Sequence, residues 1–263
     1  TSSRFITFME RSSLYAFVPD RNTGFMLSST ALNNRATWAA GVFRDSAKYA
    51  HGKEQSEGGY NLTGRVTALP WYEDAGAQLL HVGAAYSLRN PKDTVQYKSA
   101  PEAHLAPTFV DTSTLTSDEA GVLGLECAWV DGPFSLQGEY MYADVDGKDG
   151  ASSPNFDGFY IQGSYFLTGE HRNYKTSSGA FDRVKPKENY HFGGGPGAWE
   201  AAVRYSSINL DDSGVSGGEL KDITVGLNWY LNPNTRIMWD YIRADLDDVG
   251  DANLFLMRFQ VDF

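Results

Sequence analysis

The chain has 263 residues, a formal net charge of −11 at pH 7 and a single cysteine, Cys127. The excess of carboxylates disfavours a nucleic-acid partner, because surfaces that bind nucleic acids neutralise phosphates with Lys and Arg, and one cysteine excludes an internal disulfide. No stretch approaches the ~20 continuous apolar residues that a membrane-spanning helix needs, which excludes a helical membrane protein.

Strand-like segments follow one another along most of the chain, separated by clusters of Gly, Asn, Pro and Asp. No segment shows helical periodicity over three turns. The predicted strands span residues 22–32, 35–44, 59–70, 77–88, 119–131, 133–145, 156–168, 197–209, 219–231, 235–246 and 253–263. No domain boundary is visible, so the sequence predicts one all-β domain over residues 1–263.

The connections between these strands alternate between tight and long. Tight turns are predicted at 32–35, 130–133 and 232–234, and longer polar loops at 45–58, 146–155 and 210–218. Transmembrane β-barrels show this asymmetry, with short periplasmic turns and longer external loops. Strand directions counted back from a periplasmic C-terminus place residues 1–20 and 89–118 in external loops. The same count makes residues 169–196 a periplasmic connection.

The last predicted strand carries the clearest alternation. One face is formed entirely by large apolar residues: Phe255, Met257, Phe259, Val261 and Phe263. The other face carries Arg258, Gln260 and Asp262. This pattern fits the closing strand of an antiparallel transmembrane β-barrel, with one face toward lipid and the other toward a watery lumen. The last strand of a soluble sandwich would also alternate. Eleven strands is an odd number, whereas bacterial single-chain barrels have even numbers, so further strands are expected upstream.

Segments along nearly the whole chain resemble the phosphate-selective porin O and P family. They include residues 4–11 (RFITFMER), 38–43 (WAAGVF), 101–104 (PEAH), 132–140 (GPFSLQGEY), 165–172 (YFLTGEHR) and 226–233 (GLNWYLNP). The resemblance implies a barrel of about 16 strands that forms a homotrimer in the outer membrane of a Gram-negative bacterium. It further implies passage of small anions, such as phosphate or polyphosphate, through a constriction lined by Arg and Lys. On this basis the chain starts inside the third external loop and holds the last eleven strands.

Three arginines on predicted strands are candidates for the lumen wall. Arg65, Arg204 and Arg258 alternate with apolar neighbours and should therefore point inward. Each could offer forked donors to an anion, or it could brace the wall by pairing with a carboxylate, which is the favoured reading for any single one. The carboxylates expected to face inward are Glu126, Glu139, Glu200, Asp240 and Asp262.

The remaining candidate cations lie in the long connections. Residues 169–196 carry Arg172, Arg183, Lys185 and Lys187 in an otherwise acidic protein. This stretch is either a plug folded into the lumen, whose cations select anions, or a solvated loop on the periplasmic rim. Arg4, Arg11 and Arg21 lie in or near the remnant of the constriction loop and could line its narrowest point. The family pattern has more arginine near residues 97–101, where this chain has Lys98 almost alone, so strict phosphate specificity does not follow from the resemblance.

Three functions compete for this sequence. The favoured one is a passive, anion-preferring porin that needs no cofactor and no metal, with small anions and outer-membrane lipid as partners. An outer-membrane enzyme is disfavoured, because the five histidines form no cluster with Cys or carboxylates at metal-binding spacing. The third is a structural barrel within a larger envelope complex, or a porin without selectivity.

Overall fold

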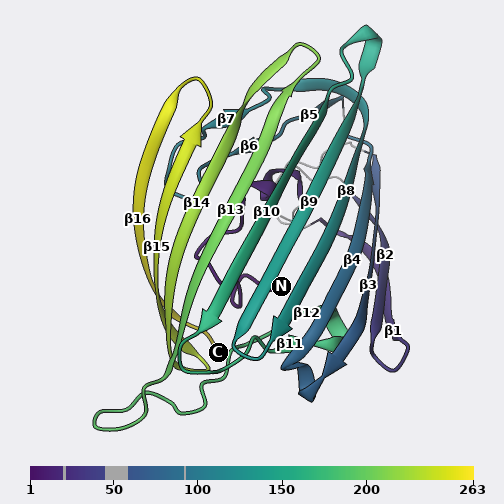
Figure 1. Cartoon of the computed structure of the whole chain (residues 1–263). Coiled ribbons are helices and arrows are strands. Elements are labelled where there is room, and N and C mark those ends of the chain that lie inside the picture. Colours follow the sequence, from purple (N-terminus) through teal and green to yellow (C-terminus); the bar gives the residue numbers. More distant parts are fainter. Residues whose placement is uncertain (20–21, 45–58, 92) are drawn as a thin grey trace.

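One antiparallel sheet of long strands curves around an interior in the computed structural model (Figure 1). The structure describes residues 1–19, 22–44, 59–91 and 93–263. The predicted loop 45–58 and the cation Arg21 lie outside these residues. Within them the all-β prediction is confirmed, and each predicted strand overlaps one long strand of the sheet.

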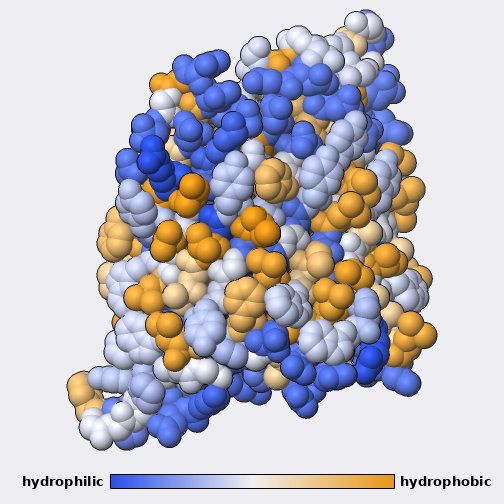
Figure 2. Space-filling model, viewed as in Figure 1, coloured by the Kyte–Doolittle hydropathy of each residue, from blue (hydrophilic) through white to orange (hydrophobic). Residues whose placement is uncertain are grey.

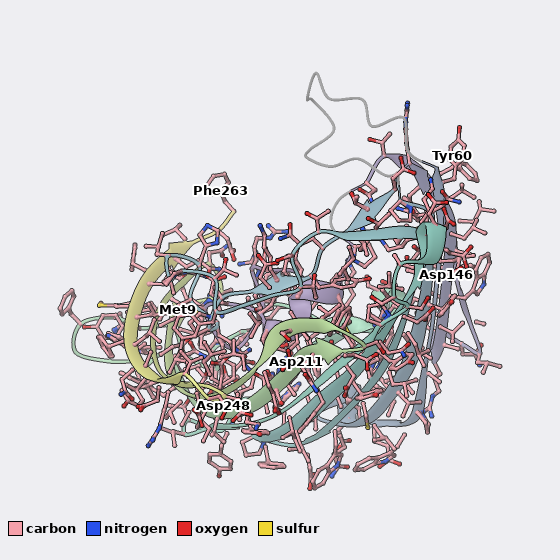
Figure 3. All side chains as sticks on the ribbon, turned by 90° about the horizontal axis from the view of Figure 1, so that it is seen from above. Met9, Tyr60, Asp146, Asp211, Asp248 and Phe263 are labelled. Carbon is pink, nitrogen blue, oxygen red and sulfur yellow. The ribbon has the colours of Figure 1, made fainter. Side chains whose placement is uncertain are left out.

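The long strands follow the order of the chain, and each pairs with its sequence neighbours. They are β1 (Gly24–Ala31), β2 (Ala36–Arg44), β3 (Tyr60–Glu73), β4 (Gln78–Arg89), β8 (Leu115–Asp131), β9 (Phe134–Gly147), β10 (Asn155–Phe166), β13 (Ala198–Asp212), β14 (Val215–Asn232), β15 (Thr235–Leu246) and β16 (Gly250–Val261). Within the described residues, β1 and β16 are the two edges, so this part of the sheet is open rather than closed. Figure 3 looks down on the resulting arc, with Met9 on its inner side.

The short elements all lie in connections. They are β5 (Thr94–Val95), β6 (Lys98–Ser99), β7 (Val110–Asp111), β11 (Tyr174–Lys175), β12 (Ala180–Phe181) and the 3-10 turns η1 (Ser13–Phe17), η2 (Asp74–Gly76), η3 (Lys148–Gly150) and η4 (Thr176–Ser178). In the part of the chain that the structure describes, no helix is long and apolar enough to cross a membrane.

One predicted loop is much shorter than expected. Residues 210–218 were expected to form a long polar connection, but the ladder between β13 and β14 continues across a bulge to the pair Asp212–Val215. Only Ser213 and Gly214 remain as the turn, and both have positive φ, of 44° and 86°. Two-residue hairpin turns favour such angles because they match the twist of the strands, which is why the hairpin extends further than its polar sequence indicates.

The outer face of the sheet is apolar at mid-height. On β16 the side chains of Phe255 and Phe259 are 69% and 63% exposed, and Met257 and Val261 share their face. Figure 2 shows a band of apolar and aromatic side chains across this face, between two hydrophilic ends. The predicted alternation is therefore confirmed, and so large an exposed apolar surface fits contact with lipid rather than water.

Among the described residues, three segments fold back onto the concave face and cover it: residues 1–19, 93–114 and 169–184. Phe17, Tyr97 and Phe156 form an edge-to-face row, with ring centroids 5.2 and 5.8 Å apart, and all three are buried. Residues 1–19 were expected in an external loop, and they run along the inside of the sheet (Figure 1). Their apolar side chains, including Phe8 and Leu14, are buried there, because packing against the concave face removes their apolar surface from water.

Candidate functional site

Two large cavities lie on the concave side of the described sheet, one on each side of residues 1–19. The first, cavity A, has a volume of about 770 Å³ and reaches from this segment to β3, β9, β10 and β13. The second, cavity B, has a volume of about 630 Å³ and lies between the same segment and residues 96–104. Ser3, Glu10, Arg11 and Tyr15 line both cavities. Residues 1–19 therefore separate the two cavities.

Basic side chains outnumber carboxylates in the lining of both cavities. Cavity A is lined by the guanidinium groups of Arg11, Arg65, Arg172 and Arg204, and by the carboxylates of Glu10 and Glu139. Cavity B is lined by Arg11, Lys98 and Arg258, with His104, and by Glu10 and Glu102. Among the described residues, the lining of these two cavities thus has the opposite charge balance to the whole chain, whose net charge is −11. Acidic residues gather at the rim that faces the viewer in Figure 3: Asp146 and Asp211 lie near the ends of β9 and β13, and Asp248 lies in the turn between β15 and β16.

The three arginines predicted on the wall, Arg65, Arg204 and Arg258, point inward, and each of these three has a carboxylate partner. Arg65 donates from Nε to Glu126 Oε1 at 2.8 Å and from Nη2 to the carbonyl of Gly179 at 2.9 Å. Arg258 donates from Nη2 to Glu10 Oε1 at 3.0 Å. These contacts favour the interpretation that the wall arginines stabilise the barrel by pairing with carboxylates, because a guanidinium paired with a carboxylate contributes little net charge to the cavity.

Arg204 has the most deeply buried pair. Its Nε donates to Glu102 Oε2 at 3.0 Å, and the two side chains are only 5% and 0% exposed. The hydroxyls of Ser206 and Thr224 donate to the same carboxylate at 2.7 and 2.6 Å. Glu102 belongs to the connection between β4 and β8, so this cluster fixes that connection to the wall at β13 and β14.

Arg183 also has a carboxylate partner: it donates to Asp262 and lies 5.2 Å from the ring of Phe5. It joins the connection after β10 to the last residues of the chain. Arg4 is exposed, and its guanidinium lies 5.3 Å from the same Phe5 ring.

Arg172 is buried, and no described carboxylate forms an ion pair with it. Its Nη1 donates to Gln137 Oε1 at 2.9 Å, and its guanidinium lies 3.6 Å from the ring centroid of Phe181. Burial lowers the pKa of Arg172, but an arginine stays protonated in proteins. The nearby carboxylate Glu139 accepts instead from Tyr160 Oη at 2.7 Å. The desolvated guanidinium of Arg172 therefore lines cavity A, and Nη1 is its only N–H group with a hydrogen bond to a described residue.

Arg11 and Lys98 likewise have no ion pair with a described carboxylate. Arg11 is exposed and donates from Nη2 to the carbonyl of Thr1 at 2.9 Å. Lys98 lies in β6, which pairs with β7, and its side chain is exposed at the edge of cavity B.

Lys185 and Lys187 are exposed, and neither lines cavity A or cavity B. The two readings of residues 169–196 apply to different halves: 169–184 folds inward with Arg172 and Arg183, whereas 185–196 projects beyond the rim (Figure 1).

The sequence did not single out Glu10, Glu102 or Gln137 as site residues. Their roles depend on contacts between residues far apart in the chain, so no local pattern marks them. One local string, Gly214-Val215-Ser216-Gly217-Gly218, matches the Gly-x-Ser-x-Gly pattern of hydrolases. It runs from the turn residue Gly214 into the start of β14, within a hairpin rather than in the strand-to-helix elbow that this pattern requires. Among the described residues, no group of His, Cys and carboxylates could hold a metal ion.

A family model described as phosphate-selective porin O and P matches residues 1–263. This chain belongs to the phosphate-selective porin O and P family. Porin O of Pseudomonas aeruginosa is 31% identical over 305 aligned residues, which cover 100% of this chain and 67% of that protein. An uncharacterised protein of Caulobacter vibrioides is 30% identical over 278 residues, which cover 97% of this chain and 54% of that protein. The chain thus spans between half and about two thirds of the length of these relatives.

Membership of this porin family agrees with the curved antiparallel sheet and its apolar outer face. It favours a channel in the outer membrane of a Gram-negative bacterium over an enzyme. The concave side of the sheet is then the lumen, and the segments that cover it narrow the passage between the two ends.

Proposed function

We propose that this chain is part of an outer-membrane porin through which small anions, among them phosphate, diffuse passively. Residues 1–263 belong to one barrel domain, of which they are the C-terminal portion, and the porin acts as a homotrimer and needs no cofactor. The observation that carries the proposal is that cavities A and B have a surplus of basic side chains inside a chain of net charge −11. Family membership supports the same class of solute.

The cations that select the anion are those that line cavity A or B and have no described carboxylate partner: Arg11, Arg172 and Lys98. A guanidinium replaces part of the hydration shell of an oxyanion with forked N–H donors. Arg11 lines both cavities, so an anion meets it on either route. Arg172 is desolvated on the Phe181 side, which strengthens its field toward the cavity. Passage also requires release, and exposed groups such as Lys98 bind weakly enough to allow it.

The test is the reversal potential of the full-length protein in a planar bilayer under a salt gradient, with phosphate then titrated in. Anion selectivity, together with chloride current blocked by phosphate, is the expected result. Cation selectivity would contradict the proposal.

A second candidate is a structural or non-selective barrel. It is favoured by one observation: Arg65, Arg183, Arg204 and Arg258 all have carboxylate partners, so most of the interior arginines brace the fold. Equal permeation of potassium and chloride in the same bilayer experiment would support this candidate.

A further inference from the structure

The outward half of the connection between β10 and β13 has features that ion passage does not use. Residues 185–196, which we call the tab, leave the sheet at the rim that carries the C-terminal end of β16 and project beyond it (Figure 1). Most of the tab is exposed, and Phe192 is 94% exposed. Burying an exposed phenyl ring in an apolar environment is favourable, so contact with such an environment would stabilise Phe192 in this position.

A continuous row of aromatic rings joins the sheet to the tab. Trp239 stacks with Trp199 at 6.4 Å between ring centroids, and Trp199 stacks with Trp229 at 4.9 Å. All three alternate with buried, inward-facing neighbours, so they lie on the outer face of the sheet. The row then crosses to the tab, because Trp229 meets Tyr190 edge-to-face at 4.9 Å and Tyr190 meets Phe192 at 5.7 Å.

Hydrogen bonds fix the tab in this position. The amide of Tyr190 donates to the carbonyl of Leu231 at 2.7 Å, and Trp229 Nε1 donates to the carbonyl of Pro196 at 2.9 Å. At the tip, the amide of Gly195 donates to His191 Nε2 at 3.0 Å, which closes the turn behind Phe192. The aromatic residues of the tab are thus presented next to the outward tryptophans rather than being free to fold away.

The chemistry of the tab fits the boundary between lipid and water. Tyr and Trp concentrate at membrane interfaces because their rings are apolar and their edges polar. The tab also carries two exposed cations, Lys185 and Lys187, against one carboxylate, Glu188. Basic side chains at this depth are attracted to anionic lipid head groups. The apolar outer face, with which the row is continuous, is the surface already assigned to lipid.

We propose that the tab docks on the phospholipid surface at this rim, with Tyr190 and Phe192 in the interfacial layer and Lys185 and Lys187 against anionic head groups. The tab thereby widens the contact of the barrel with that leaflet on the side of β13 to β15. The proposal does not depend on which ion passes through the lumen.

Three single-cysteine proteins, each carrying the same environment-sensitive fluorophore, test this docking. The native Cys127, which is exposed on the same face of β8 as Leu125 and Trp129, reports the lipid-facing wall. Asn189→Cys, in a Cys127→Ser background, reports the tab and keeps both of its aromatic residues. Ser177→Cys, in the same background, is the matched control, because it is exposed in the inward half of the same connection. Each protein is reconstituted in phosphatidylethanolamine–phosphatidylglycerol vesicles that contain lipids with a quencher near the head group.

The label at residue 189 should be quenched several-fold more strongly than the label at residue 177. Adding Phe192→Ser should reduce this quenching toward the level of residue 177. Lys185→Glu with Lys187→Glu should remove the part of the quenching that depends on phosphatidylglycerol. Equal quenching at residues 189 and 177 would overturn the proposal, as would a label at residue 189 that is shielded from water but not quenched by lipid, because the partner would then be another protein surface.

Discussion

Two sets of cations share the concave side of the sheet, and their surroundings differ. The strand arginines Arg65, Arg204 and Arg258 are each paired with a carboxylate. Arg11, Arg172 and Lys98 belong to the segments that cover the sheet, and no described carboxylate pairs with them. An inward position on a strand is therefore a poor guide to which cation binds the anion. The strand arginines hold the inner segments against the sheet, whereas the cations of the inner segments are available to a solute.

The largest expected effect comes from breaking the most buried wall pair. Arg204→Met leaves the Glu102 carboxylate buried without its cation, and removing one partner of a buried pair costs about 3–5 kcal/mol. The connection between β4 and β8 should then leave the wall, which limited proteolysis within residues 90–114 would detect. The double variant Arg204→Met with Glu102→Gln is the control, and it should recover much of the stability measured by denaturant unfolding. Equal losses in the single and double variants would show that the pair does not position the connection.

The next largest effect should distinguish the paired strand arginines from the unpaired cations of the inner segments by their contribution to phosphate block. Arg172→Met removes a buried cation that has no direct ion pair with a described carboxylate, although the charge of Glu200 acts on it. The concentration of phosphate that half-blocks chloride current should therefore rise about tenfold, equivalent to ~1.4 kcal/mol. The matched control is Arg65→Met with Glu126→Gln, which removes one cation and one carboxylate together. That control should leave the block nearly unchanged. A larger loss in the control than in Arg172→Met would reverse the roles assigned to the two sets.

A pH effect is expected where the inner segments pack together. Burial raises the pKa of Tyr97 to about 12, whereas an unfolded tyrosine titrates near 10. The folded state therefore keeps a proton that the unfolded state loses between pH 10 and 12, and stability should fall as pH rises through this window, by ~1.4 kcal/mol at about pH 11. Tyr97→Phe should abolish this alkaline loss and leave stability at pH 8 almost unchanged. Unfolding midpoints at the two pH values give the comparison, and an equally steep alkaline loss in the variant would assign the effect to another group.

The smallest effect should come from Lys98. Its ammonium is exposed and screened by salt, so Lys98→Gln should weaken the phosphate block by only about threefold, or ~0.6 kcal/mol. The effect should shrink further at high ionic strength, whereas that of Arg172→Met should persist. Bilayer recordings at two salt concentrations distinguish the two variants.

The sequence predicted the strands well because successive side chains of a strand point to opposite faces, so apolar and polar residues alternate where the two faces meet different environments. The alternation on β16 predicted both of its faces, and the inward direction of Arg65, Arg204 and Arg258 followed from the same rule. The partners of these arginines could not be predicted. Glu102 meets Arg204 across 102 positions of sequence, and Glu10 meets Arg258 across 248, so only the fold brings them together. The sequence likewise did not predict the division of residues 169–196 into an inward and an outward half, because both halves are basic and each carries two aromatic residues.

The inner segment has a consequence for the order of folding. Every long strand pairs with the long strand before or after it in the chain, so the sheet can grow one strand at a time, through loops that are far shorter than the whole chain. Residues 1–19 are different: the amide of Met9 donates to Asp240 at 2.8 Å across 231 positions, and Arg236 donates to the carbonyl of Ile6 across 230. These contacts exist only after β15 is in place. The sheet should therefore form first and enclose a wide lumen, and residues 1–19 should pack onto its concave face and narrow that lumen only in a late step of folding.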